Sequence, residues 1–211
     1  MNTKYILLAV FLLACGEPPF AEDTDSNLNE NSRNVANSVP YFFQYENSLF
    51  PESSCQNTSI AMLLKYSGWD GVPDDITEEW GNDFAQDPEN LGYLFNVIST
   101  DHFLRTALNT TVDGTLKSFR STVDAGFILI VHGYFTNHGH VLVVTGRNSD
   151  GDYIVNDPAG VWTERFRGGY EPSESDDGKG IVYQKEYFEA AVSTSDGAGF
   201  MPLQYHTLVE F

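Results

Sequence analysis

The N-terminal half of the chain carries apolar residues at helical spacing. Residues 54–66 carry apolar residues at positions 60, 61, 63 and 64, with Met62 between them, and end at Ser67-Gly68, a helix stop signal, so a mostly buried helix is expected there. A similar pattern recurs twice further along, and Gly126 closes the last occurrence. Helices are therefore predicted over residues 54–66, 88–99 and 115–124, with a short acidic helix within residues 70–82.

After Gly126 the pattern changes to short β-branched runs separated by turn signals. Residues 127–132 (FILIVH) form a continuous apolar run, which is typical of a central strand. The turn signal NSDG separates two further runs, and Asp157-Pro158 ends the second of them. Strands are predicted over residues 127–132, 140–146, 153–156 and 206–211, with a helix over residues 185–192. Helices followed by an antiparallel sheet indicate an α+β fold.

The first 39 residues do not follow either pattern. Residues 1–15 combine Lys4 with a short apolar run and end in Leu-Leu-Ala-Cys, which resembles a bacterial lipoprotein signal. That resemblance implies acylation of Cys15 and an anchor in the lipid bilayer of the cell envelope, in the outer membrane if the host has one. An ordinary signal peptide cut nearby is the alternative. Residues 16–39 are polar and aperiodic, as in a flexible tether, so the folded domain is predicted over residues 40–211.

Composition narrows the classes of partner. Apolar residues make up 41% of the 211 residues, which suffices for one packed domain and argues against global disorder. Acidic residues outnumber basic ones by 30 to 11, giving a formal net charge of −19. Such a surface repels polyanions, so nucleic acid is not an expected partner.

The chain has two cysteines, Cys15 and Cys55. If Cys15 carries lipid, Cys55 is a lone thiol in an exported protein, which calls for a reason. Cys55 lies in the first turn of a predicted helix, where the helix dipole favours a thiolate. Cys55 is therefore either a catalytic nucleophile or a small buried apolar side chain.

A thiol nucleophile needs a histidine that a third polar group orients. Among the five histidines, His140 begins a strand directly after a glycine-bearing turn. If an even loop at Asp150-Gly151 joins that strand to the next, His140 and Asp157 share one face of the sheet. We therefore predict a His140–Asp157 pair. His132 reads as a core residue at a strand end.

Two segments resemble the peptidase C39-like group, papain-like relatives of bacteriocin-processing peptidases. The segment PYFFQYENSLFPESSCQNTSIAMLLKYSG resembles the nucleophile region of that group, and GHVLVVTGRNSDGDYIVNDPAG resembles its second half. The resemblance implies a papain-like fold in which the nucleophile helix packs on the sheet. It implies Cys55 as nucleophile, His140 as general base and then acid, Asp157 as the orienting group and Gln44 as an oxyanion donor. The group usually has Cys-Gly-Pro at the nucleophile, whereas Gln56-Asn57 follows Cys55 here.

The expected activity is hydrolysis of a peptide or amide bond outside the cytoplasm, in a peptide or protein substrate and without a cofactor. Peptidoglycan endopeptidase or amidase activity and transglutaminase-like acyl transfer are the alternatives within enzymes. A non-catalytic peptide-binding lipoprotein is the alternative of another class. His138 and His140 lack the further ligands of a zinc site, and NSDGD lacks the terminal glutamate of a calcium loop. No metal is expected.

Overall fold

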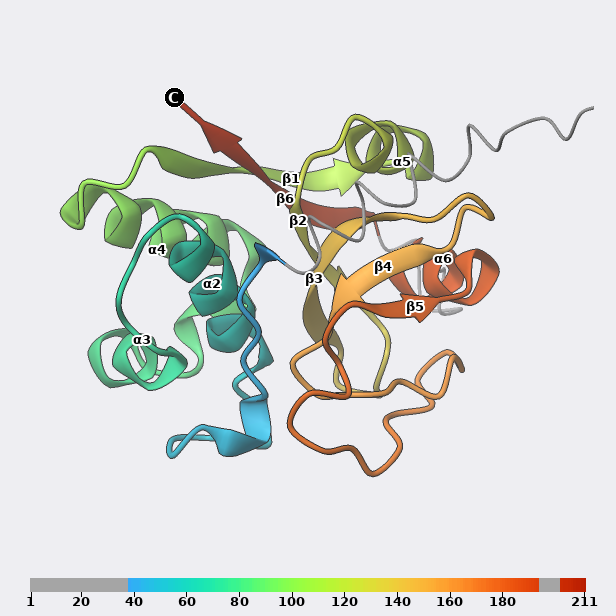
Figure 1. The fold of residues 1–211 in the computed structure, drawn as a ribbon, viewed down its shortest axis with the longest axis horizontal. Coiled ribbons are helices and arrows are strands. Elements are labelled where there is room, and N and C mark those ends of the chain that lie inside the picture. The colour runs from blue at the N-terminus through green and yellow to red at the C-terminus, as the bar shows by residue number, and fades with distance from the viewer. Residues whose placement is uncertain (1–37, 194–201) are drawn as a thin grey trace, which may run out of the picture.

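The computed structural model of the chain describes residues 38–193 and 202–211, and within them the fold is α+β. Three helices come first, and a strand and a further helix follow them. The remaining strands come next, with one more helix before the last strand (Figure 1). The predicted signal peptide with Cys15, and nearly all of the predicted tether, lie outside the described residues. The helices are α2 (Cys55–Tyr66), α3 (Pro73–Trp80), α4 (Pro88–Asp101), α5 (Leu116–Asp124) and α6 (Lys185–Ser193), with 3-10 turns η1 (Gln44–Glu46) and η2 (Phe84–Gln86).

Each predicted helix is present. The helix α2 begins at Cys55 and ends before Gly68, whose φ of 102° suits a glycine. Thr115 caps α5 by accepting a hydrogen bond from the backbone N–H of Ser118. The helix α4 exposes Glu89 and buries its apolar side, as its pattern predicts.

The sheet has six antiparallel strands in the order β1-β6-β2-β3-β4-β5. The strands that the apolar runs predict lie at its centre, and the two that they miss lie at its edges. Their bounds are β1 (Thr106–Gly114), β2 (Leu129–Gly133), β3 (His140–Arg147), β4 (Tyr153–Asn156), β5 (Ile181–Tyr183) and β6 (Leu203–Glu210).

Both faces of the sheet are covered. Figure 1 shows α2, α3 and α4 gathered on one side of the sheet and α5 and α6 on the other. Along β3 the side chains alternate accordingly, so Val141 and Val143 face the first group while Leu142 and Val144 face the second. The packed domain also includes Val39, which is fully buried one residue before the predicted start of the domain.

A hydrogen bond joins the first half of α2 to the sheet. Ser59, one turn into α2, donates its hydroxyl to the carbonyl oxygen of Val141 at 3.1 Å. Val141 directly follows His140, so this contact ties the helix that carries Cys55 to the strand that carries His140. Among the described residues, no helix is both long and apolar enough to cross a membrane.

Candidate active site

The predicted His140–Asp157 pair is in direct contact. His140 opens β3, and Asp157 comes directly after β4. The His140 Nε2 atom lies 2.8 Å from Asp157 Oδ1, and the two side chains are only 5% and 0% exposed. The bond engages Nε2, which leaves Nδ1 as the ring nitrogen available to a nucleophile.

His140 and Asp157 share a face of the sheet, but the reason is not the even loop expected from the sequence. The loop between β3 and β4 spans residues 148–152, an odd number, because Arg147 pairs with Tyr153. The assumption of an even loop is therefore wrong. A bulge between Val144 and Gly146 adds one residue to β3, and beyond it Val143 pairs with Asn156. The bulge offsets the odd loop and returns His140 and Asp157 to one face.

Both carboxylate oxygens of Asp157 accept hydrogen bonds. Its Oδ1 also accepts from the backbone N–H of Ala159 at 3.0 Å, and its Oδ2 accepts from the hydroxyls of Tyr170 at 2.9 Å and Tyr183 at 3.0 Å. Burial, followed by the Asp157 charge, raises the pKa of both tyrosines well above the ordinary value. Both therefore remain O–H donors at any physiological pH, and the carboxylate is fixed toward His140.

The environment of His140 favours its charged form. Burial disfavours the imidazolium, but the Asp157 carboxylate and the Cys55 side chain outweigh burial and raise the pKa of His140. The ring of Phe135 lies edge-on to the imidazole at 6.0 Å, and that of Tyr170 at 5.1 Å. These contacts restrict rotation of the ring, so His140 is held between Asp157 and Cys55.

Cys55 lies in the first turn of α2 and is half-buried. It opens onto a cavity of about 480 Å³ whose wall also includes Gln44 and His140. A substrate in this cavity would touch the sulfur and the imidazole, while Asp157 stays behind the imidazole and out of contact. The cavity therefore brings the thiol and the imidazole together, with the carboxylate that orients the imidazole behind it.

Gln44, the predicted oxyanion donor, is buried in the same wall. The loop after it folds back, because Asn47 donates to the hydroxyls of Ser54 at 2.9 Å and Thr58 at 2.8 Å. The Gln44 side-chain amide donates one hydrogen to the carbonyl oxygen of Pro51 at 2.9 Å. An amide NH₂ group has two hydrogens, so this bond uses one of the two.

His132, which also lines this cavity, is a poorer base than His140. Its Nε2 lies 2.9 Å from Nε2 of the fully buried His206, whose Nδ1 lies 3.0 Å from the hydroxyl of Thr110. Burial lowers the pKa of His132 to about 4 and that of His206 to about 3. The interpretation of His132 as a core residue fits this pairing.

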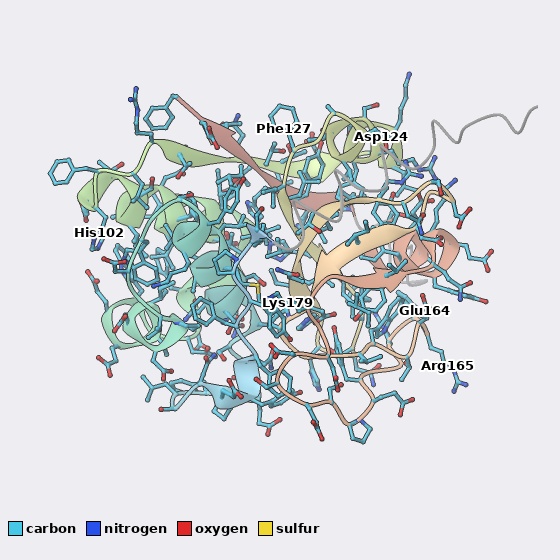
Figure 2. The ribbon with its side chains drawn as sticks, viewed as in Figure 1. His102, Asp124, Phe127, Glu164, Arg165 and Lys179 are labelled. Carbon is cyan, nitrogen blue, oxygen red and sulfur yellow. The ribbon has the colours of Figure 1, made fainter. Side chains whose placement is uncertain are left out.

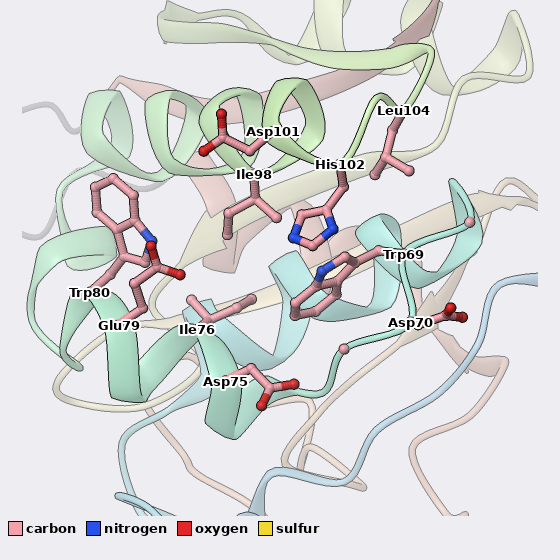
Figure 3. Close-up of a pocket in the computed structure, with 12 residues that line it drawn as sticks. Trp69, Asp70, Asp75, Ile76, Glu79, Trp80, Ile98, Asp101, His102 and Leu104 are labelled. Carbon is pink, nitrogen blue, oxygen red and sulfur yellow. The ribbon is translucent and has the colours of Figure 1, made fainter.

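A second cavity, of about 550 Å³, lies away from the candidate site (Figure 3). Trp69 and His102 lie edge to face at 6.1 Å in its wall, with carboxylates such as Asp75 and Asp101 around them. Figure 2 places His102 on the helical side of the molecule, far from Glu164 at the opposite side. None of the four predicted catalytic residues lines this cavity.

Nothing in the described ranges suggests a metal centre. Residues 38–193 and 202–211 contain no group of three or more histidine, cysteine or carboxylate side chains arranged to hold a metal ion.

The fold and the site together define an α+β protein with a thiol and an imidazole at one cavity and a buried carboxylate behind the imidazole. The family model of the peptidase C39-like family matches residues 36–188, which is most of the chain, and the chain belongs to that family. This membership supports a peptidase function. A crystal structure from Bacillus anthracis, assigned as a C39-like peptidase, shares the fold with a TM-score of 0.55 and 16% identity, over 84% of this chain and 96% of that chain. A search of curated proteins found no match.

Proposed function

We propose that this chain is a cysteine peptidase in which Cys55 attacks the carbonyl carbon of a peptide bond. The observation that carries this proposal is the buried His140–Asp157 pair beside a half-buried thiol in one cavity. Among the described residues, His140 is the histidine with a carboxylate partner. His132, by contrast, is bonded to a second histidine. The family supports peptide-bond hydrolysis as the reaction.

The proposed reaction has two steps. His140 takes the proton of the Cys55 thiol as the sulfur forms a bond to the carbonyl carbon, and it then gives this proton to the leaving amine as the C–N bond breaks. Water then attacks the resulting thioester while His140 takes one of its protons, and the acid product leaves with the Cys55 thiol restored. Asp157 keeps the imidazole in the orientation that both proton transfers require.

The negatively charged oxygen of each tetrahedral intermediate needs hydrogen-bond donors to stabilise it. The backbone N–H of Cys55, at the start of α2, and the second amide hydrogen of Gln44 are the proposed donors. The loss of one donor of this kind typically lowers the rate by about 100- to 1,000-fold.

Selective chemical inactivation tests the class of peptidase. The full chain is incubated with a denatured protein, and new amino termini are measured before and after treatment with iodoacetamide, with EDTA as the parallel treatment. We expect alkylation of Cys55, read on the tryptic peptide 34–65, to abolish hydrolysis in proportion to its extent, and EDTA to leave hydrolysis unchanged. Hydrolysis that continues after complete alkylation, or that EDTA stops, would contradict a cysteine mechanism.

We further propose that the chain acts outside the cytoplasm, attached to the cell envelope through lipid on Cys15, because residues 1–15 resemble a lipoprotein signal. Bacteria that express the full chain and receive radiolabelled palmitate should yield a labelled protein in the membrane fraction. The Cys15→Ser variant should lose the label, whereas Cys55→Ala should keep it. A Cys15→Ser protein that remains labelled would refute the attachment.

A further inference from the structure

The thiol of Cys55 has a partner other than His140. It donates to the side-chain oxygen Oε1 of Gln56, at a sulfur–oxygen distance of 3.4 Å. Gln56 is the next residue of α2, is 2% exposed, and lines the cavity beside Cys55.

The orientation of the Gln56 amide is fixed by the loop after α3. Its nitrogen Nε2 donates to the backbone oxygen of Asn82 at 2.5 Å and lies 3.3 Å from Asn82 Oδ1. Turning the amide over would set its oxygen against two other oxygens, so Oε1 faces Cys55. Asn82 is anchored in turn, because its own amide donates to the hydroxyl of Ser53 at 3.0 Å and to the Ser53 carbonyl oxygen at 3.2 Å.

The two partners of the sulfur favour opposite protonation states. An oxygen that accepts from S–H stabilises the thiol, because the thiolate has no hydrogen to donate and its charge faces a carbonyl lone pair. The imidazolium of His140 stabilises the thiolate instead. Gln56 therefore opposes the effect of His140 on the Cys55 sulfur.

We propose that Gln56 is a positioning residue that opposes the ionisation of the Cys55 thiol. This inference rests on the proposed function only in taking Cys55 as the reactive thiol. The alternative is that Gln56 has only a structural role, as the buried hydrogen-bond partner of Asn82. The two roles predict different effects on Cys55 when a negative charge is introduced at position 56.

Two substitutions separate the roles. The rate at which iodoacetamide alkylates the full chain is measured against pH without substrate, and modification of Cys55 is read on the tryptic peptide 34–65. We expect Gln56→Leu, which lacks an acceptor, to shift the midpoint of the profile down by about one pH unit, so that alkylation at acid pH becomes about tenfold faster. Gln56→Glu, which places a carboxylate beside the sulfur, should shift the midpoint upward by a similar amount.

Both variants lose the hydrogen bonds to Asn82, so a purely structural role predicts the same direction of change in both. Asn57→Ala is the matched control: Asn57 is the next residue, is fully buried, and donates to Thr77 at 2.9 Å and to the Gly81 carbonyl oxygen at 3.2 Å. The alkylation profile of the Asn57→Ala variant should have the same midpoint as that of the unsubstituted chain, even if the variant melts at a lower temperature.

Midpoints that coincide for Gln56→Leu and Gln56→Glu, or that move in the same direction, overturn the proposal. If Gln56→Leu does not fold, Gln56→Met takes its place, because methionine is unbranched like glutamine and its sulfur is a weak acceptor. The alkylation assay requires no turnover, so its outcome is independent of whether the chain proves to be a peptidase.

Discussion

Cys55→Ala is expected to lower kcat/KM for peptide hydrolysis by at least about 10⁴-fold, because no other described side chain at the cavity supplies a comparable nucleophile next to His140. The fold should survive. Cys55 is half-buried and loses only a sulfur atom, so we expect the free energy of unfolding to change by no more than about 1 kcal/mol. Initial rates on one peptide and thermal melts of the same samples measure the two effects.

The control for this variant is the other cysteine of the chain. Cys15→Ser removes a thiol that lies outside the predicted domain, and in detergent solution it should leave kcat/KM unchanged. The double variant Cys55→Ala with His140→Ala should be no slower than either single variant, because the two residues act as a unit. Full activity in Cys55→Ala would rule out the nucleophile proposed here.

The order of helices and central strands could be predicted from the sequence because buried elements leave a regular apolar pattern. The strand β1 leaves none: its residues (TALNTTVDG) are mostly polar, and it lies at the edge of the sheet beside β6. The strand β5 has three residues, too few for any pattern to emerge. Edge strands bury fewer side chains than central strands, so composition constrains them less.

Part of the candidate site could likewise be predicted from the sequence, and part of it could not. Local signals identified Cys55 at a helix start and His140 at a strand start, and both lie at the cavity. The bulge after Val144 left no signal, so the argument from loop length reached the right pair through a wrong assumption. Only the folded chain brings Tyr170 and Tyr183 to Asp157, because they come from positions 13 and 26 residues further on that follow no period.

Gln44 and Gln56 show the same limit at the level of single side chains. Both were noted in the sequence, one as an oxyanion donor and the other as a departure from the usual glycine. What each amide contacts depends on loops: the Pro51 carbonyl oxygen for Gln44 and the Asn82 backbone for Gln56. The conformation of such loops follows from packing between distant segments, which one sequence does not display.

Asp157→Ala is expected to be the most damaging single change, because it affects both activity and stability. It removes the acceptor for four donors at a fully buried position: the ring of His140, the backbone N–H of Ala159, and the hydroxyls of Tyr170 and Tyr183. The Tyr183 hydroxyl keeps the carbonyl oxygen of Gly160 as an acceptor at 3.1 Å. Buried donors left without a partner typically cost about 1–3 kcal/mol each, and part of that loss is recovered by relaxation and water. We expect a loss of about 3–5 kcal/mol in the free energy of unfolding, measured in urea, and a fall in kcat/KM of about 10⁴-fold.

Asp157→Asn separates the two effects. Asparagine keeps the shape and one acceptor oxygen, so the loss of stability should be smaller than in Asp157→Ala. Its amide carries no charge to favour the His140 imidazolium, so kcat/KM should still fall by about 10³- to 10⁴-fold. The matched control is Glu189→Gln, at the other well-bonded buried carboxylate, which accepts from Arg120 and from Tyr153 at 2.9 Å. That variant should lose stability and keep activity, because Glu189 does not line the cavity. If Asp157→Asn and Glu189→Gln lost activity equally, the carboxylate behind His140 would be serving the fold and not the reaction.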